Sequence, residues 1–355
     1  MTMKEKTRAA LRFEEVRPTP YTVWYDCHAK AILDRHYGDG SWQDRIHDHI
    51  VRICIDWRPR TVVAEDRFLD VHGSLWQVGD PVHLVVPALK EPDLAGFTIP
   101  SYVPFIRRGR GHPAAAAEWP QIPGKYSLSL EETERLLAAI DGTAFTEVDF
   151  GYGVLESAWM IRGYEEFLTD LAAEPVFARR LLALLAERHL ELLDVILQLP
   201  CDAVMLTDDF GDQHGITIGP ERWRAFVKPW LKTLYARIHA AGKMAFHHSD
   251  GNVMDVVPDL IECGLDVLQS VQSEAMPVYE LKHRFGRNLG LWGGLGTQKL
   301  LPFGTADAVR QEVRRMKREL GRGGGYVFST SKPLTGDIPL ENLVALVEES
   351  IADDG

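Results

Sequence analysis

The stretch Lys243-Met-Ala-Phe-His-His-Ser-Asp-Gly251 decides the fold that we expect. A short apolar run of strand length ends in two histidines, a serine and an aspartate, and a new helical pattern begins at Asn252. This pattern predicts titratable side chains at the carboxyl end of a buried strand. In proteins that alternate strands and helices, ligands bind at that edge of the sheet.

The chain after Pro200 repeats the same strand-then-helix pattern, which calls for parallel strands joined by right-handed crossovers. No Gly-x-Gly-x-x-Gly turn follows an early strand, so an α/β (β/α)8 TIM barrel fits better than an open sheet. We expect strands at 144–150, 203–206, 243–246, 266–269, 289–292 and 326–328, and helices at 130–140, 220–241, 252–262, 277–285, 305–320 and 340–351.

The chain before this alternation carries many prolines and only brief apolar runs. A strand is expected at 82–87, and the segment 92–125 has the composition of a long ordered loop or lid. We therefore predict one structural domain, with an N-terminal elaboration and lid over residues 1–125 packed on a barrel region over residues 126–355.

Composition narrows the classes of partner. The chain has 355 residues, of which 45% are hydrophobic, and 39 basic residues stand against 51 acidic ones, for a net charge of −12. This balance argues against nucleic acid and anionic membrane surfaces as partners. No stretch approaches the uninterrupted apolar length of a membrane span, so we expect a cytoplasmic location. Four widely spaced cysteines argue against a disulfide framework.

If the chain forms a barrel, the residues just after each strand share one face. They are rich in titratable groups: Tyr152, Glu156, Asp208, Asp209, His214, His247, His248, Asp250, Gln269, Gln272, Trp292, Ser329, Ser331 and Lys332.

Only one of the two adjacent histidines can face the barrel centre, because neighbouring strand residues point to opposite sides. We favour His248, which shares its side with Asp250, and interpret His247 as structural. A His-x-Asp pair is able to ligate zinc, with Asp209 or Glu156 as a third ligand. The alternative is that His248 is a structural residue with satisfied hydrogen bonds.

Two further patterns have a functional and a structural interpretation. Asp208 and Asp209 are able to bind a metal or act as acid and base, whereas a structural aspartate would cap a neighbouring turn. Glu156, Trp159 and Arg162 share one face of a predicted helix. Arg162 is able to clamp a substrate carboxylate or phosphate, or to form an ordinary ion pair.

A series of motifs runs in order from about residue 150 to 348. They are Leu155-Glu-Ser-Ala-Trp-Met-Ile-Arg-Gly163, Leu206-Thr-Asp-Asp-Phe-Gly211, Pro220-Glu-Arg-Trp, Phe226-Val-Lys-Pro229, His248-Ser-Asp-Gly251, Leu268-Gln-Ser-Val-Gln272, Gly293-Gly-Leu-Gly-Thr-Gln298, Gly323-Gly-Gly-Tyr326 and Pro339-Leu-Glu-Asn342. With these motifs the sequence resembles the uroporphyrinogen decarboxylase superfamily. This resemblance implies a barrel of parallel strands with an active-site cleft at its carboxyl face.

The superfamily comprises two chemistries, and this chain departs from both patterns. The decarboxylases have an arginine- and glycine-rich N-terminal segment that binds the acidic porphyrinogen, whereas the region from Val16 to Tyr37 lacks an arginine cluster. The corrinoid-linked zinc methyltransferases have a His-x-Cys-Gly motif and a late cysteine. Here His248 matches the histidine, Asp250 replaces the first cysteine, and Ser329-Thr-Ser331-Lys332 contains no cysteine. This excludes a thiolate-rich zinc site and leaves a histidine and carboxylate site open.

We therefore predict a methyltransferase or demethylase acting on a small substrate, with a divalent metal such as zinc and a corrinoid on a partner protein as its candidate cofactors. The predicted catalytic residues are Asp209, His248 and Asp250, and the candidate metal ligands are these three with Glu156. The predicted substrate-binding residues are Tyr152, Trp159, Arg162, Gln272, Trp292 and Lys332.

Two alternatives remain open from the sequence. In a cofactor-free decarboxylase or other lyase, Arg162 would bind a carboxylate and Asp209 or His248 would supply a proton. A non-catalytic binding or docking subunit is the other alternative. The resemblance also suggests a homodimer.

Overall fold

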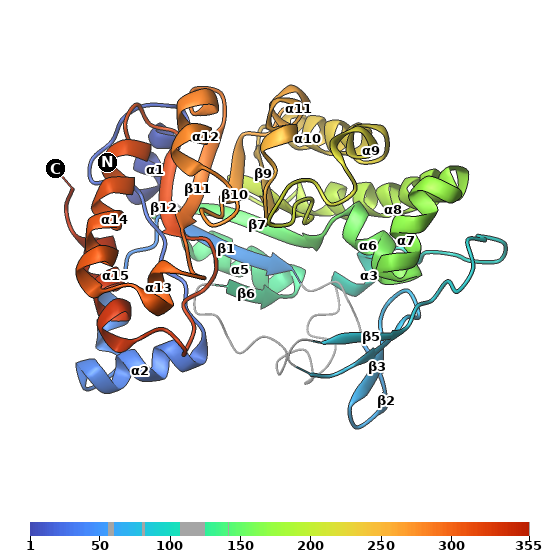
Figure 1. The fold of residues 1–355 in the computed structure, drawn as a ribbon, viewed down its shortest axis with the longest axis horizontal. Coiled ribbons are helices and arrows are strands. Elements are labelled where there is room, and N and C mark those ends of the chain that lie inside the picture. The colour runs from blue at the N-terminus through green and yellow to red at the C-terminus, as the bar shows by residue number, and fades with distance from the viewer. Residues whose placement is uncertain (56–59, 80–81, 107–124, 141, 355) are drawn as a thin grey trace.

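The computed structural model describes residues 1–55, 60–79, 82–106, 125–140 and 142–354. Within these residues, eight strands form one curled parallel sheet in the order β6-β1-β7-β8-β9-β10-β11-β12 (Figure 1). The strands are β1 (Ile50–Ile55), β6 (Lys125–Leu128), β7 (Phe145–Tyr152), β8 (Ala203–Thr207), β9 (Met244–Ser249), β10 (Val267–Ser270), β11 (Gly290–Leu295) and β12 (Tyr326–Thr330).

Residues 20–26 pair with the edge strand β12 and reach the residue that precedes β1. Thr22 N donates to Phe328 O, and Phe328 N donates to Pro20 O, so this segment pairs with β12. On its other side, His49 N, directly before β1, donates to Tyr21 O. The segment therefore satisfies backbone groups that an open sheet edge would expose.

Helices surround the sheet and cover its outer face (Figure 1). They are α1 (Met3–Leu11), α2 (Cys27–Tyr37), α3 (Val103–Ile106), α5 (Leu130–Ile140), α6 (Val154–Arg162), α7 (Tyr164–Ala173), α8 (Pro175–Ile196), α9 (Pro220–Phe226), α10 (Lys228–Ala240), α11 (Val257–Cys263), α12 (Val278–Phe285), α13 (Leu300–Phe303), α14 (Ala306–Leu320) and α15 (Leu340–Ile351), with 3-10 turns at Ser41–Arg45 and Met254–Val256.

The single helix expected over 220–241 is wrong, because the structure divides it into α9 and α10 at Val227. Pro229 explains the division. Proline has no N–H to donate and its ring clashes with the preceding turn, so it is tolerated at the start of α10 and not inside a continuous helix.

The N-terminal region, expected to be an elaboration packed on the barrel, also contributes a strand to the parallel sheet. Residues 50–55 form β1, which lies inside the parallel sheet between β6 and β7. The strand expected at 82–87 is present as β5. The lid expected over 92–125 falls largely on residues 107–124, which lie outside the described residues. A separate antiparallel sheet consists of β2 (Thr61–Ala64), β3 (Arg67–Leu69), β4 (Leu75–Gln77) and β5 (His83–Val86).

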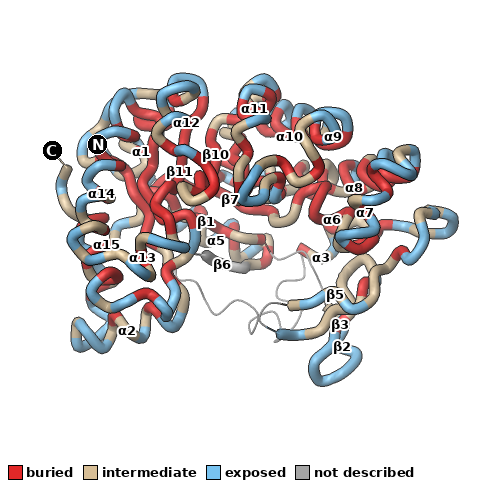
Figure 2. The backbone as a smooth tube through the Cα atoms, viewed as in Figure 1, coloured by how far each residue is buried: buried red, intermediate tan, exposed pale blue. Residues whose placement is uncertain are grey.

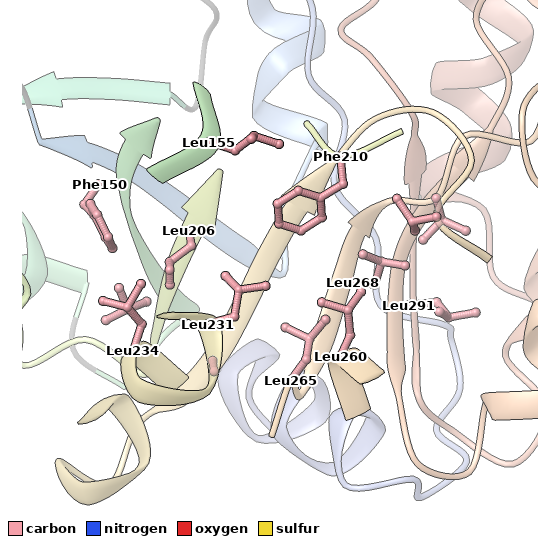
Figure 3. Close-up of a cluster of buried hydrophobic side chains, with 14 of the residues drawn as sticks. Phe150, Leu155, Leu206, Phe210, Leu231, Leu234, Leu260, Leu265, Leu268 and Leu291 are labelled. Carbon is pink, nitrogen blue, oxygen red and sulfur yellow. The ribbon is translucent and has the colours of Figure 1, made fainter. Parts of the chain in front are cut away.

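Two hydrophobic clusters stabilise the barrel. The larger lies between the sheet and its helices, where Phe210, Leu231 and Leu268 pack together (Figure 3). Figure 2 shows β7, β10 and β11 of the parallel sheet buried and the helices exposed on their outward faces, whereas β2 of the antiparallel sheet is exposed. Burying one such side chain contributes about 1.5–3 kcal/mol. The smaller cluster is contributed by inward-facing strand residues and α1: Leu11, Ile50, Phe145, Ala203, Met205, Phe246, Val267, Trp292 and Val327.

None of the described helices combines the length and the apolar character that a membrane crossing requires.

Candidate active site

The interior of the barrel changes from apolar to polar toward the carboxyl ends of the strands. In six strands, an apolar residue of the smaller cluster is followed two positions later, on the same side, by a polar one. The apolar residues form a lower layer that closes the barrel. The polar residues form an upper layer that presents donors, acceptors and charges at the mouth. The pairs are Ile50 and Arg52, Phe145 and Glu147, Met205 and Thr207, Phe246 and His248, Val267 and Gln269, and Val327 and Ser329.

His247 and His248 face opposite sides of β9. His247 lies toward the helices, where its Nδ1 is 2.8 Å from the hydroxyl of Tyr235 and its ring stacks on Phe210 with centroids 4.8 Å apart. Burial lowers its pKa to about 3, so the imidazole is neutral. His248 lies on the barrel side, where its Nδ1 donates to Gln269 Oε1. The geometry therefore agrees with the expectation from strand alternation.

His248, Asp209 and Asp250 converge at the mouth. Their candidate ligand atoms all lie within 4.8 Å of one another. His248 Nε2 is 3.8 Å from Asp209 Oδ1 and 3.7 Å from Asp250 Oδ2. Because Gln269 accepts the Nδ1 proton, the lone pair of a neutral imidazole is on Nε2 and points toward both carboxylates. Burial lowers the pKa of His248, which favours this neutral form.

The surrounding contacts fix both carboxylates. Asp250 Oδ1 accepts a hydrogen bond from Ser270 Oγ at 2.7 Å, and Asp209 Oδ1 accepts one from Asp250 N at 2.8 Å. The ammonium of Lys332 contacts Asp250 Oδ2. Burial alone would raise the pKa of Asp250, but His248 and Lys332 outweigh it and lower that pKa. Asp250 is therefore a carboxylate at neutral pH.

Asp208 has a structural position instead. Its carboxylate accepts hydrogen bonds from Leu155 N at 3.0 Å and Glu156 N at 2.8 Å, and so caps the start of α6. Burial raises the pKa of Asp208 to about 7. Gly153 is required beside it, because a Cβ there would come within 2.5 Å of Asp208 Oδ2.

Sequence reasoning missed Arg52, which lies inside the barrel. Its Nη2 donates to Asp149 Oδ2 at 2.7 Å, its Nε is 3.9 Å from Glu147 Oε2, and its guanidinium lies 5.5 Å from the ring centre of Trp24. Burial disfavours the charge, but the two carboxylates more than offset this and raise the pKa of Arg52. The available signal was an arginine inside the apolar run Ile50-Val-Arg-Ile-Cys-Ile55.

Three other predicted site residues lie near the mouth in different roles. Gln272 is buried, and its Oε1 accepts a hydrogen bond from Gly251 N at 3.1 Å, so it holds the turn after β9. Tyr152 is half-buried at the end of β7, where its carbonyl contacts His189 Nε2 at 2.9 Å. Glu156 is buried in the first turn of α6 and lies outside the group of three converging ligand atoms.

The remaining predicted substrate-binding residues are not brought to this group. Arg162 is buried, with its Nε bonded to Asp170 Oδ2 at 2.7 Å and its Nη1 to Lys90 O at 2.9 Å. Trp159 packs edge-on against Tyr164. Trp292 belongs to the apolar layer below the mouth and donates its indole N–H to Thr22 Oγ1 at 2.9 Å. All three stabilise the fold in this geometry.

The parallel barrel and the polar layer at the carboxyl ends of its strands define the class of protein, a TIM-barrel fold with a candidate active site at its mouth. A family model described as uroporphyrinogen decarboxylase (URO-D) matches residues 153–351. The chain therefore belongs to the URO-D family, which confirms the resemblance found in the sequence.

Individual relatives agree with this family. The uroporphyrinogen decarboxylase of Methylococcus capsulatus is 25% identical over 182 residues, which cover 49% of this chain and 48% of that protein. That of Thermus thermophilus is 29% identical over 136 residues, or 37% of each chain. The chain thus spans about half or less of the length of these curated relatives.

One solved structure is similar over nearly the whole chain. It is described as a methyltransferase from Methanosarcina mazei, with a TM-score of 0.65, 19% identity and coverage of 99% of this chain and 98% of that one. This likeness confirms the predicted barrel fold.

Proposed function

We propose that the protein is a metal-assisted methyltransferase or demethylase that acts on a small molecule at the barrel mouth, with a corrinoid protein as the methyl-carrying partner. The proposed metal site is supported by the convergence of Asp209, His248 and Asp250, whose candidate ligand atoms lie within 4.8 Å of one another. Methyl transfer is placed first because the structural neighbour is described as a methyltransferase. The family model and barrel support an enzyme in the coarser sense.

The donor set suits a divalent cation. One imidazole nitrogen and two carboxylate oxygens are ligands that zinc accepts, and the bonds from Gln269, Ser270 and Asp250 N orient them as outer ligands do at metal sites. A bound zinc ion would supply a Lewis acid that polarises the heteroatom losing or accepting the methyl group. The chain itself provides a neutral His248 and a deprotonated Asp250 at neutral pH.

Lys332 is the competitor for this cation, because its ammonium already contacts Asp250 Oδ2. The side chain of Lys332 is 49% exposed and that of Asp250 is 16% exposed, so water screens this ion pair only in part. A divalent cation, with twice the charge, would displace the ammonium. Lys332 is then free to bind an acidic or polar group of the substrate at the rim.

Metal analysis of protein purified without chelator tests the proposal. We expect one zinc or similar divalent ion per chain in the wild type and none in His248→Ala. His239→Ala is the matched control, because His239 lies on α10 and contacts Asp266. The proposed metal site would be overturned if the wild-type protein binds no divalent ion, even after reconstitution.

A metal-free decarboxylase is the second candidate, and the Lys332–Asp250 ion pair favours it, because it gives the mouth a cation without a metal. Lys332 would bind the substrate carboxylate, since Arg162 is already engaged with Asp170 and Lys90. Asp209 or His248, after taking up a proton from solvent, would pass it to the developing carbanion. Release of carbon dioxide from aromatic or pyrrolic acids by chelator-treated protein would favour this reaction over methyl transfer.

A further inference from the structure

Three side chains of the inner wall carry buried polar atoms with no hydrogen-bond partner among the described residues. They are Gln269 Nε2, Ser329 Oγ and Ser331 Oγ, and each of the three residues is 0% exposed. An unpaired buried amide or hydroxyl costs about 1–3 kcal/mol. Such groups are rare in native proteins, so three of them near one site require partners from bound water or from a bound ligand.

These atoms belong to one sector of the barrel. Ser329 lies two positions after the interior residue Val327, so alternation along β12 turns it inward. Ser331 continues this ladder, since its N–H donates to Leu295 O of β11. Gln269, on β10, already reaches His248 with its amide oxygen.

On the strand between them, β11, Trp292 is the register partner of Gln269 and is followed by two glycines. Gly293 and Gly294 have φ values of 122° and 108°, which disfavour any other residue. A Cβ on Gly293 would also come within 1.9 Å of Ser270 O. Gly294 is the register partner of Ser329, so β11 places no side chain beside that serine.

The chemistry of the three atoms defines what they bind. An amide nitrogen only donates, and a hydroxyl is able to donate, so the complementary group is an acceptor. Charge decides between a neutral acceptor and an anion. The carboxylates of Asp149, Glu147, Asp209 and Asp250 outnumber the cations of Arg52 and Lys332 around the mouth. An additional anion buried there would be repelled.

We propose that Gln269, Ser329 and Ser331 form a subsite for an uncharged oxygen acceptor of the substrate, such as a carbonyl, carboxamide or ether oxygen. The inference rests on the proposed function in one respect, that the substrate binds at this mouth. The subsite orients the substrate from the β10–β12 side, while Asp209, His248 and Asp250 contact it from the side of β8 and β9.

Benzamide and benzoate are suitable probes, since they differ in charge and have nearly the same shape. Binding is measured by titration calorimetry and ligand-observed NMR on full-length protein in chelator, so that no metal contributes. We expect benzamide to bind at least 10-fold more tightly than benzoate. The double variant Ser329→Ala/Ser331→Ala should bind benzamide at least 10-fold more weakly than the wild type. In soaked wild-type crystals, the benzamide oxygen should contact both hydroxyls.

The melting temperature distinguishes a ligand-binding role of Ser329 and Ser331 from a structural role. Because the two hydroxyls have no partner in the described chain, the double variant should melt at or above the wild-type temperature. Ser74→Ala is the matched control, since Ser74 is also buried but bonds both Met160 O and Ala88 N. That variant should melt lower and bind benzamide like the wild type.

Three outcomes would overturn the subsite: benzoate binding more tightly than benzamide, benzamide binding unchanged in the double variant, or soaked crystals that show ordered water only at the hydroxyls. Zinc stoichiometry of the double variant keeps the two proposals apart, because neither serine is a proposed ligand. If the wild type binds benzamide but no zinc, the metal-assisted function is overturned and the subsite is still supported.

Discussion

His248 on β9 donates its Nδ1 proton to the amide oxygen of Gln269 on β10, and this bond directs its Nε2 toward Asp209 and Asp250. The two residues are register partners on adjacent strands, so the strand pairing itself fixes the contact. It selects one tautomer of the imidazole and one orientation of its ring. The candidate metal site therefore depends on a residue that would not itself touch the metal.

Replacing this partner tests the dependence. Gln269→Leu should lower zinc affinity about 10- to 100-fold, because His248 loses the acceptor that fixes its tautomer. Gln269→Glu keeps an acceptor for the Nδ1 proton and should restore most of the affinity. Zinc titration against a competing chelator measures both, and equal affinities for the two variants would contradict the positioning role.

Lys332 should oppose cation binding. In Lys332→Met, Asp250 loses its ammonium partner, so zinc no longer competes with that cation and its affinity should rise several-fold. The same titration measures this change. Lys299→Met serves as an exposed control on another loop. A fall in zinc affinity in Lys332→Met would show that Lys332 is not a competitor.

His247 should make the fold sensitive to acid. Its pKa is about 3 in the native state against an ordinary value of 6.5, so between these pH values the unfolded chain binds a proton that the native chain does not. Stability from this residue is therefore intact above pH 6.5 and decreases as the pH falls, by about 1.4 kcal/mol per pH unit.

The comparison of wild type with His247→Gln isolates this effect from other titrating groups. The advantage of the wild type over the variant should shrink by about 2–3 kcal/mol between pH 6.5 and 4.5 in urea unfolding. His283→Gln, at an exposed position on α12, should leave the pH dependence unchanged. A constant difference across this range would show that His247 does not remain neutral in the native state.

Arg162 should stabilise the fold and leave substrate binding untouched. Arg162→Met leaves Asp170 buried without its partner, which should cost about 3–5 kcal/mol in the free energy of unfolding. Arg162→Met/Asp170→Leu should recover much of that loss, because both charges are removed. A raised KM with unchanged stability in the single variant would instead restore Arg162 as a substrate-binding residue.

The sequence predicts those features of the site that depend on residues close together in the chain. Alternation along one strand is a local rule, so the order of residues is enough to separate His247 from His248. The same local rules give no information on whether a side chain near a strand or helix end, such as Trp292 or Arg162, meets a neighbour from elsewhere in the chain. Thr22 and Asp170 supply those neighbours.

The sequence by itself determined the barrel, because apolar runs at regular spacing and breaks at proline and glycine are encoded within a few residues. It also predicted that His248 and Asp250 share a side of β9. Only the tertiary structure decided that Asp209 joins them, that Asp208 caps α6, and that Arg52 and the hydroxyls of Ser329 and Ser331 line the interior. These outcomes depend on strand pairing and closure of the barrel, which bring together residues that lie 41, 52 and 97 positions apart in the sequence.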